Sequence, residues 1–239
     1  MNSLLKVRLS YYFFILLGIF VVVAFTIDTK EFTGPALTLF SVNSFLYGFY
    51  IAPILTGQKA RLDELQKVIR AEANVLFGLL IKTKKLDDAL RNEYQIMFED
   101  YIKKSLKQRR PAEGEEEYEK LISYSLQYKG LDKDTVEKIL EGLVQNQQNR
   151  STLSMQLKNK VYSNEWWVML VLFSITLGFI LFLEIGTSWQ MNLVKAFLCT
   201  GLTMLIVILI KLSTLTHKKA KELWQPLEKL LHTRFYRID

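Results

Sequence analysis

Four apolar stretches constrain this chain more than any other feature of its sequence. They cover residues 9–27, 35–55, 166–183 and 193–210. Each is close to the roughly 20 residues that a helix needs to cross about 30 Å of hydrocarbon. An unpaired backbone amide in lipid costs several kcal/mol, so spans of this composition must be α-helices. The sequence therefore predicts an all-α membrane protein with four transmembrane helices.

The charged residues lie almost entirely outside these stretches. Residues 56–165 hold 20 Lys or Arg and 18 Asp or Glu, whereas the first stretch holds no charge and the fourth holds only Lys195. A disordered acidic tail or a soluble enzyme with one apolar core does not show this segregation. We expect four parts in chain order: a transmembrane hairpin at 1–55, a polar helical region at 56–165, a second transmembrane hairpin at 166–210, and an amphipathic tail at 211–239.

Basic residues near the span ends predict the orientation. Thirteen of them lie within about 16 residues of the span ends on one side: Lys6, Arg8, Lys59, Arg61, Lys67, Arg70, Arg150, Lys158, Lys160, Lys211, Lys218, Lys219 and Lys221. The short loops on the other side offer only Lys30 and Lys195. Because Lys and Arg accumulate in cytoplasmic segments, we expect a multi-pass plasma-membrane protein whose termini and residues 56–165 face the cytoplasm. The first span is too long for a signal-peptide core, so we expect it to be retained.

Several classes of function lack support in the sequence. The net charge of +7 fits basic residues beside anionic headgroups, and the nearly balanced region 56–165 offers no basic face for nucleic acid. Cys199 is the single cysteine, and two tail histidines, His217 and His232, have no metal-ligand spacing, so no metal or other cofactor is predicted. The sequence shows no nucleophile paired with a base and no glycine-rich phosphate loop, so no feature of it indicates an enzyme.

Apolar periodicity predicts helices outside the spans as well. The second span is expected to continue as a long amphipathic helix through Leu80, and further helices are expected at 87–108 and 115–128. A fourth, opening at Asp134, could run into the third span. The tail has one apolar stripe, which predicts a helix lying on the membrane surface or on a neighbouring subunit; it consists of Trp224, Leu227, Leu230 and Leu231.

The second span carries polar side chains on two opposite faces. At 100° per residue, one face holds Ser41, Phe45, Gly48, Phe49 and Ala52. The opposite, polar face holds Asn43, Tyr47 and Tyr50, together with Ile54. Polar groups in a membrane are placed where a neighbour or a pathway satisfies them, so we expect this helix to be surrounded by other helices or by water. Lys195, near the outer end of the fourth span, is expected to reach the headgroups instead.

The segment Ser44-Phe45-Leu46-Tyr47-Gly48-Phe49-Tyr50-Ile51 resembles the second-span motif that lines the pore neck of bestrophins. The four-span order and the long second helix are also similar to that family. The Glu72-Ala73 step and Arg150 resemble the bacterial bestrophin-like membrane proteins of uncharacterised function. The resemblance extends over nearly the whole chain, although its individual matching residues are few.

The resemblance implies a ring of subunits, five in bestrophins, with second spans around a central ion pathway. Phe45 and Phe49 match the neck phenylalanines, and Ser41 stands where bestrophins have a third apolar residue, which implies a shorter hydrophobic gate. The calcium-clasp residues of animal bestrophins have no counterpart here. Because bestrophins include anion and cation conductors, the charge of the ion stays open.

Two functional hypotheses follow. The first is an oligomeric bestrophin-like channel that conducts small ions through a pore lined by Ser41, Phe45 and Phe49. The second is a non-conducting membrane scaffold or regulator, whose cytoplasmic helices bind a partner while its spans anchor it in the bilayer. Under the second hypothesis the two phenylalanines only pack between helices, as most aromatic residues in spans do.

Overall fold

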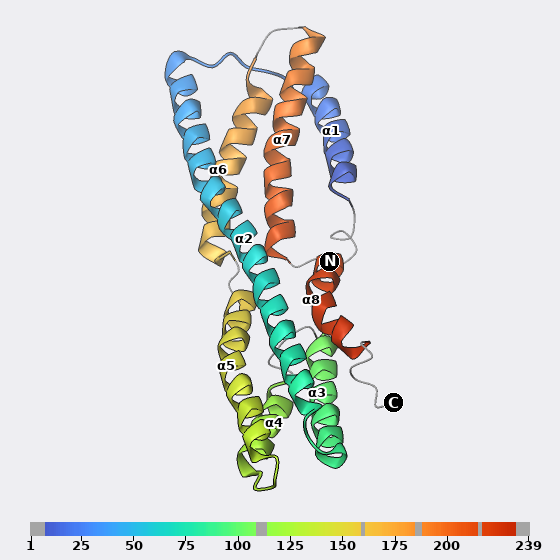
Figure 1. Ribbon diagram of the computed structural model, residues 1–239. Helices are drawn as coiled ribbons and strands as arrows, with labels where there is room; N and C mark the ends of the chain where they lie inside the picture. The colour runs from blue at the N-terminus through green and yellow to red at the C-terminus, as the bar shows by residue number, and fades with distance from the viewer. Residues whose placement is uncertain (1–7, 109–113, 159–160, 185–187, 215–216, 233–239) are drawn as a thin grey trace. The chain divides into compact units, whose positions relative to one another are not determined.

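The computed structural model describes residues 8–108, 114–158, 161–184, 188–214 and 217–232, and these residues form eight helices and no strand (Figure 1). Four helices are long and apolar enough to cross a membrane: α1 (Leu9–Thr26), α2 (Gly34–Thr83), α6 (Ser163–Phe182) and α7 (Trp189–Ser213). The others are α3 (Asp88–Gln108), α4 (Glu115–Gln127), α5 (Lys133–Lys158) and α8 (His217–Leu231). The predicted helical fold with four apolar spans is confirmed for the described residues.

The chain divides into two compact units. The apolar unit combines Met1–Ala60 with Lys160–Thr216, and the polar unit combines Arg61–Asn159 with His217–Asp239. Helix α2 contributes to both units. Its 50 residues extend about 75 Å at 1.5 Å per residue, more than twice the hydrocarbon thickness. Only its uncharged part, residues 35–55, is therefore suited to the bilayer.

In the apolar unit, α7 packs against α1 and α6. Small side chains let these helices approach closely, because Ala24, Ala196 and Cys199 are buried in one cluster with Phe20 and Ile180. A second cluster joins α2, α6 and α7. Close packing of this kind is what holds helices together in lipid, where burying apolar surface brings no gain over contact with acyl chains.

The end of α6 is closed by two basic residues from other segments. The backbone N–H of Lys30 donates to the carbonyl of Phe182 at 2.8 Å, and Lys195 Nζ of α7 donates to the carbonyl of Leu181 at 3.2 Å. Lys195 is only 1% exposed, so the expectation that it reaches the headgroups is wrong. Its ammonium group instead satisfies a carbonyl in the last turn of α6, where the helix dipole also favours a cation.

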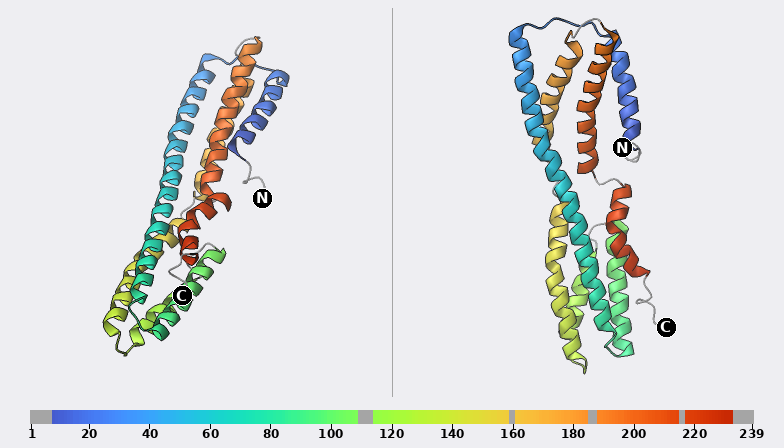
Figure 2. Two further views of the ribbon diagram at one scale, coloured as in Figure 1. Left: turned by 45° about the vertical axis from the view of Figure 1, so that its right-hand side comes forward. Right: turned by 45° about the horizontal axis from the view of Figure 1, so that its top comes forward.

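The polar unit is built around the second half of α2. Helix α4 packs between α3 and α5, and α8 packs on α3 (Figure 2). Its core contains fully buried residues from α2, α3, α4 and α5, among them Leu65, Leu76, Tyr94, Phe98, Tyr118, Leu121, Ile139 and Leu143. The predicted long second helix and the helices expected at 87–108 and 115–128 are all present within a few residues of their expected bounds.

Helix α5 does not continue into the third span, contrary to the expectation from its periodicity. It ends at Lys158, and Val161 and Tyr162 lie outside any helix before α6 begins at Ser163. Tyr162 has an extended backbone, and the Glu165 carboxylate accepts a hydrogen bond from its backbone N–H at 3.0 Å. This contact caps the start of α6 and separates it from α5.

Helix α8 is amphipathic as predicted, but its apolar stripe is already covered. Trp224, Leu227 and Leu230 are buried, and α8 packs against α3 of its own unit. The expectation that this stripe rests on the membrane or on a neighbouring subunit is therefore wrong for this structure. Burial against α3 is favourable because it removes the same apolar side chains from water.

One polar contact in the apolar unit joins α2 to α6. The Asn43 side-chain amide donates to Thr176 Oγ1 at 2.8 Å and to the backbone carbonyl of Leu172 at 3.1 Å. Thr176 in turn donates to the same carbonyl, at 2.9 Å. This contact fixes both the height of α2 beside α6 and its rotation about its own axis.

We expect Asn43→Leu and Thr176→Val to destabilise the protein in a coupled way, because each removes one partner of the same hydrogen bond. A double-mutant cycle of thermal unfolding in detergent should give a coupling energy of about 0.6–1.7 kcal/mol, the range found for such bonds in membrane proteins. Thr38→Val is the matched control, since the Thr38 hydroxyl bonds only within α2. Strictly additive effects of Asn43→Leu and Thr176→Val would show that the contact contributes nothing.

Candidate functional site: the two faces of α2

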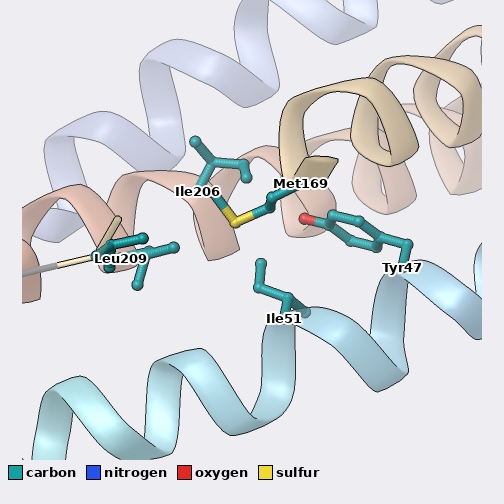
Figure 3. Packing of buried hydrophobic residues seen from close by; sticks show 6 residues of the cluster. Tyr47, Ile51, Met169, Ile206 and Leu209 are labelled. Carbon is teal, nitrogen blue, oxygen red and sulfur yellow. The ribbon is translucent and has the colours of Figure 1, made fainter. Parts of the chain in front are cut away.

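One face of α2 is covered by α6 and α7. Tyr47 and Ile51 are 2% and 3% exposed, and both pack in a cluster with Met169, Ile206 and Leu209 (Figure 3). Tyr50 and Ile54 are partly buried at the edge of this cluster. Together with Asn43, these residues make up the face that the helical periodicity assigned to Asn43, Tyr47 and Tyr50. That face is directed into the protein.

This inward face is polar in composition, yet only part of it forms hydrogen bonds. Asn43 bonds α6, whereas the buried hydroxyls of Ser44 and Tyr47 have no hydrogen-bond partner among the described residues. In Figure 3 the Tyr47 hydroxyl points towards Met169 and Ile206. The aromatic ring of Tyr47 also contacts that of Phe173, with 6.1 Å between centroids. Tyr47 therefore contributes mainly as a packed aromatic ring.

The opposite face of α2 meets no other part of the described chain. Phe45 and Phe49 are each 70% exposed, and their rings stack on one another with centroids 6.0 Å apart and an interplanar angle of 18°. Ser41 is exposed and donates to the carbonyl of Leu37 within the helix at 3.0 Å. Gly48 and Ala52 are exposed beside them. The open face thus consists of Ser41, Phe45, Gly48, Phe49 and Ala52.

A proline interrupts the helix on the same side. Pro53 lies inside α2 and is exposed. Because proline has no N–H, the carbonyl of Phe49, four residues earlier, lacks its normal helical donor. A backbone carbonyl without its donor is costly in hydrocarbon but not in water or against another protein surface. Pro53 therefore leaves one backbone carbonyl on this side of α2 to be satisfied by another donor.

The described residues offer little for other chemistry at this site. No group of three or more His, Cys, Asp or Glu side chains in them is placed to hold a metal ion. Cys199 is buried in the cluster that also contains Phe20, Ala24, Ile180 and Ala196. The α2 segment 35–55 carries no charged side chain. What the site presents is therefore a neutral surface of aromatic rings, small residues and one hydroxyl.

A second group of chemistry-bearing residues converges inside the polar unit. The hydroxyl of Tyr101, on α3, donates to Glu72 Oε1 on α2. Arg150 of α5 lies over two rings, with its guanidinium carbon 3.8 Å from the centroid of Tyr118 and 5.2 Å from that of Tyr101. Arg150 Nη2 donates to Glu115 Oε2 at 2.7 Å. We call Glu72, Tyr101, Glu115, Tyr118 and Arg150 the buried cluster; Glu115 lies at its edge, with a side chain that is 42% exposed.

Burial raises the pKa values of Glu72 and Tyr118 in this cluster. Glu72 and Arg150 are 1% and 2% exposed. Burial raises the pKa of the Glu72 carboxyl, against the opposing effects of the Tyr101 hydrogen bond and the Arg150 charge. Burial likewise raises the pKa of Tyr118 to about 12, so that it stays a neutral hydrogen-bond donor to the carbonyl of Leu143 at 2.7 Å.

Sequence reasoning identified the two faces of α2 but missed the buried cluster. In the sequence, Glu72 is a point of resemblance to bacterial proteins and Arg150 is that and one of the basic residues near the span ends, but nothing in the sequence predicts that the two lie close together. One signal was present: Glu72 follows Ile69 by three residues and precedes Leu76 by four, on the apolar stripe of the long helix. A carboxyl on such a stripe indicates a buried charge that needs partners.

Comparison with known proteins agrees with the fold. No curated protein and no solved structure matches the chain. A family model, that of the bestrophin-like domain, matches residues 9–219. This match includes all four apolar helices, the polar helices α3 to α5 and both faces of α2. Because it extends over most of the sequence, the chain belongs to the bestrophin-like family, which confirms the family resemblance.

Proposed function

We propose that this membrane protein is an ion channel, in which several copies of the chain place their α2 helices around a central pathway lined by Ser41, Phe45 and Phe49. The observation that carries the proposal is the open face of α2. Two large aromatic side chains there are 70% exposed, while the opposite face of the same helix is packed against α6 and α7. Family membership supports a ring, which has five subunits in bestrophins.

The chemistry of the open face favours a pathway over a lipid contact. The Phe49 carbonyl lacks a helical donor because of Pro53, and water or a neighbouring subunit can satisfy it whereas acyl chains cannot. Gly48 leaves open space where a side chain would be, which lets neighbouring helices approach closely. Both features belong to the same side of the helix as Phe45 and Phe49.

Within a ring, this face would control the passage of ions although it carries no charge itself. A collar of phenylalanine rings makes a narrow passage that water leaves readily, and an ion cannot cross it without its hydration shell. Ser41 stands one turn before Phe45, so a hydroxyl would replace a third apolar collar. The hydrophobic barrier would then be short. Small inorganic ions are the proposed permeating species.

The alternative function is a non-conducting scaffold or regulator. In that case the polar unit binds a partner, the spans anchor the protein, and the open face of α2 contacts lipid. The compact polar unit, with its own buried core, is compatible with this role. The two functions differ in whether copies of α2 meet one another, which an experiment can decide.

We further propose that both termini and residues 56–165 face the cytoplasm of a plasma membrane. The support is the charge distribution, since basic residues flank the spans on this side and only Lys30 and Lys195 lie on the other.

We expect purified protein in planar bilayers to conduct, and Phe45→Ala and Phe49→Ala to increase the current, because each removes one aromatic collar. A barrier lowered by about 1.4 kcal/mol corresponds to a roughly tenfold rise. Phe14→Ala is the control, since Phe14 is a similarly exposed phenylalanine on α1. A preparation that is monomeric in detergent and never conducts would favour the scaffold.

Contact between α2 helices can be tested by cross-linking. In a Cys199→Ala background, Ala52→Cys places the single thiol on the open face, and a short bismaleimide should link neighbouring subunits into covalent dimers, since each thiol can join only one partner. Ile54→Cys, on the covered face of the same helix, should remain unlinked. Equal, weak linking at both positions would mean that α2 meets no sister helix.

The orientation predicts which loops are accessible from outside. In right-side-out membrane vesicles, a membrane-impermeant maleimide should label Glu31→Cys, in the loop between α1 and α2, without permeabilisation. Asp88→Cys, at the start of α3, should be labelled only after permeabilisation. Both positions are exposed, so accessibility of the side chain is not limiting. The reverse labelling pattern would overturn the proposed orientation.

A further inference from the structure

The Glu72 carboxyl, buried in the polar unit, has no role in the proposed pathway and supports a separate inference. The Tyr101 hydroxyl donates to its Oε1, whereas no described residue donates to its Oε2. A buried carboxylate needs several hydrogen-bond donors, or a counter-ion that pairs with it alone, to offset its loss of hydration. Glu72 has a single hydrogen bond from a neutral hydroxyl. Its surroundings therefore suit the protonated carboxylic acid better than the carboxylate.

The groups that face Glu72 come from three other helices. They are Tyr101 of α3, Glu115 and Tyr118 of α4, and Arg150 of α5. The cluster thus contains two carboxyl groups and one guanidinium. It is neutral when one of the two carboxyls holds a proton, and it carries one negative charge when both are ionised.

Arg150 is engaged with the other carboxyl. Its Nη1 donates to Glu115 Oε1 at 3.3 Å and to Gln147 Oε1 at 3.0 Å, in addition to the 2.7 Å bond from Nη2 to Glu115 Oε2. This two-point pairing engages the Arg150 guanidinium with Glu115, while its charge also acts on Glu72. The two carboxyls therefore compete for one cation, and Glu115 holds it in the observed arrangement.

We propose that Glu72 is a proton-binding site of the polar unit: it holds a proton while Arg150 pairs with Glu115, and loss of that proton to solvent draws Arg150 from Glu115 towards Glu72. The residues concerned lie on α2, α3, α4 and α5, so a shift of Arg150 changes contacts among four helices of the unit. The ligand is H⁺, and no other reactant is needed. The proposal does not depend on conduction.

The sign of the effect on stability can be worked out. Burial raises the pKa of Glu72 above its ordinary value of 4.5. As pH rises past that ordinary value, the unfolded chain loses the proton while the folded protein keeps it. The stability contributed by this group is thus complete at low pH and is lost as pH rises through the higher, folded-state pKa. Glu72→Gln, which mimics the protonated acid, removes this loss.

The test compares thermal unfolding of the full-length protein in detergent at several pH values. We expect wild type and Glu72→Gln to have similar Tm values near pH 4.5, and the variant to exceed wild type by at least about 3 °C near pH 8. Glu141→Gln, which changes an exposed carboxylate on α5, is the control and should follow wild type. Parallel curves for wild type and Glu72→Gln would overturn the proposal.

Infrared difference spectroscopy gives a direct second readout that does not depend on a variant's stability. The wild-type protein should show the C=O stretching band of a protonated buried carboxyl at pH values above the ordinary Glu pKa of 4.5, and Tyr101→Phe should shift its frequency by removing the hydrogen bond. In Glu115→Gln, Arg150 loses its competing carboxylate, so the band should vanish at a lower pH than in wild type. A wild-type spectrum without the band, or an unchanged titration in Glu115→Gln, would refute the site.

Discussion

The rotation of α2 about its own axis determines which of its side chains pack against α6 and α7 and which remain exposed. In hydrocarbon, a polar side chain has no water to form hydrogen bonds with. A single amide can therefore determine which face of a helix is directed towards the protein. Asn43 meets this need by bonding both a side chain and a backbone carbonyl of α6. With Asn43 directed inward, Phe45 and Phe49 are necessarily directed outward, since they lie on the opposite side of the same helix.

The same constraint operates at the helix ends and inside the polar unit. Lys195, buried at the end of α6, donates to a carbonyl that its own helix cannot satisfy. Arg150 is stacked on Tyr118 and paired with Glu115, so that its buried charge is covered on several sides. In each case a specific acceptor compensates a buried cation for its lost hydration. Glu72 is the exception, with one donor for two oxygens, and this imbalance makes protonation the simplest way to neutralise it.

Periodicity in the sequence was enough to find the helices and the two faces of α2, because length, apolar content and the 100° repeat are local properties. It failed where the answer depended on a neighbour. Lys195 is near a span end in sequence, but α6 supplies a carbonyl that holds it inside. The α8 stripe was expected to lie on the membrane or on a neighbouring subunit, but it is buried in a unit where α8 packs on α3. No proline or glycine precedes the start of α6, which is capped by Glu165. The pairing of Arg150 with Glu115 likewise joins helices that sequence spacing cannot place together.

Two separate proposals act on one continuous element, since Phe45, Phe49 and Glu72 all belong to α2. An α-helix is stiff along most of its length, so a rotation imposed at one point is felt at others. Pro53 lies between the two sites and removes one backbone hydrogen bond, and helices bend at such points. Coupling between the two sites would require that α2 have two discrete arrangements that both sites favour differently.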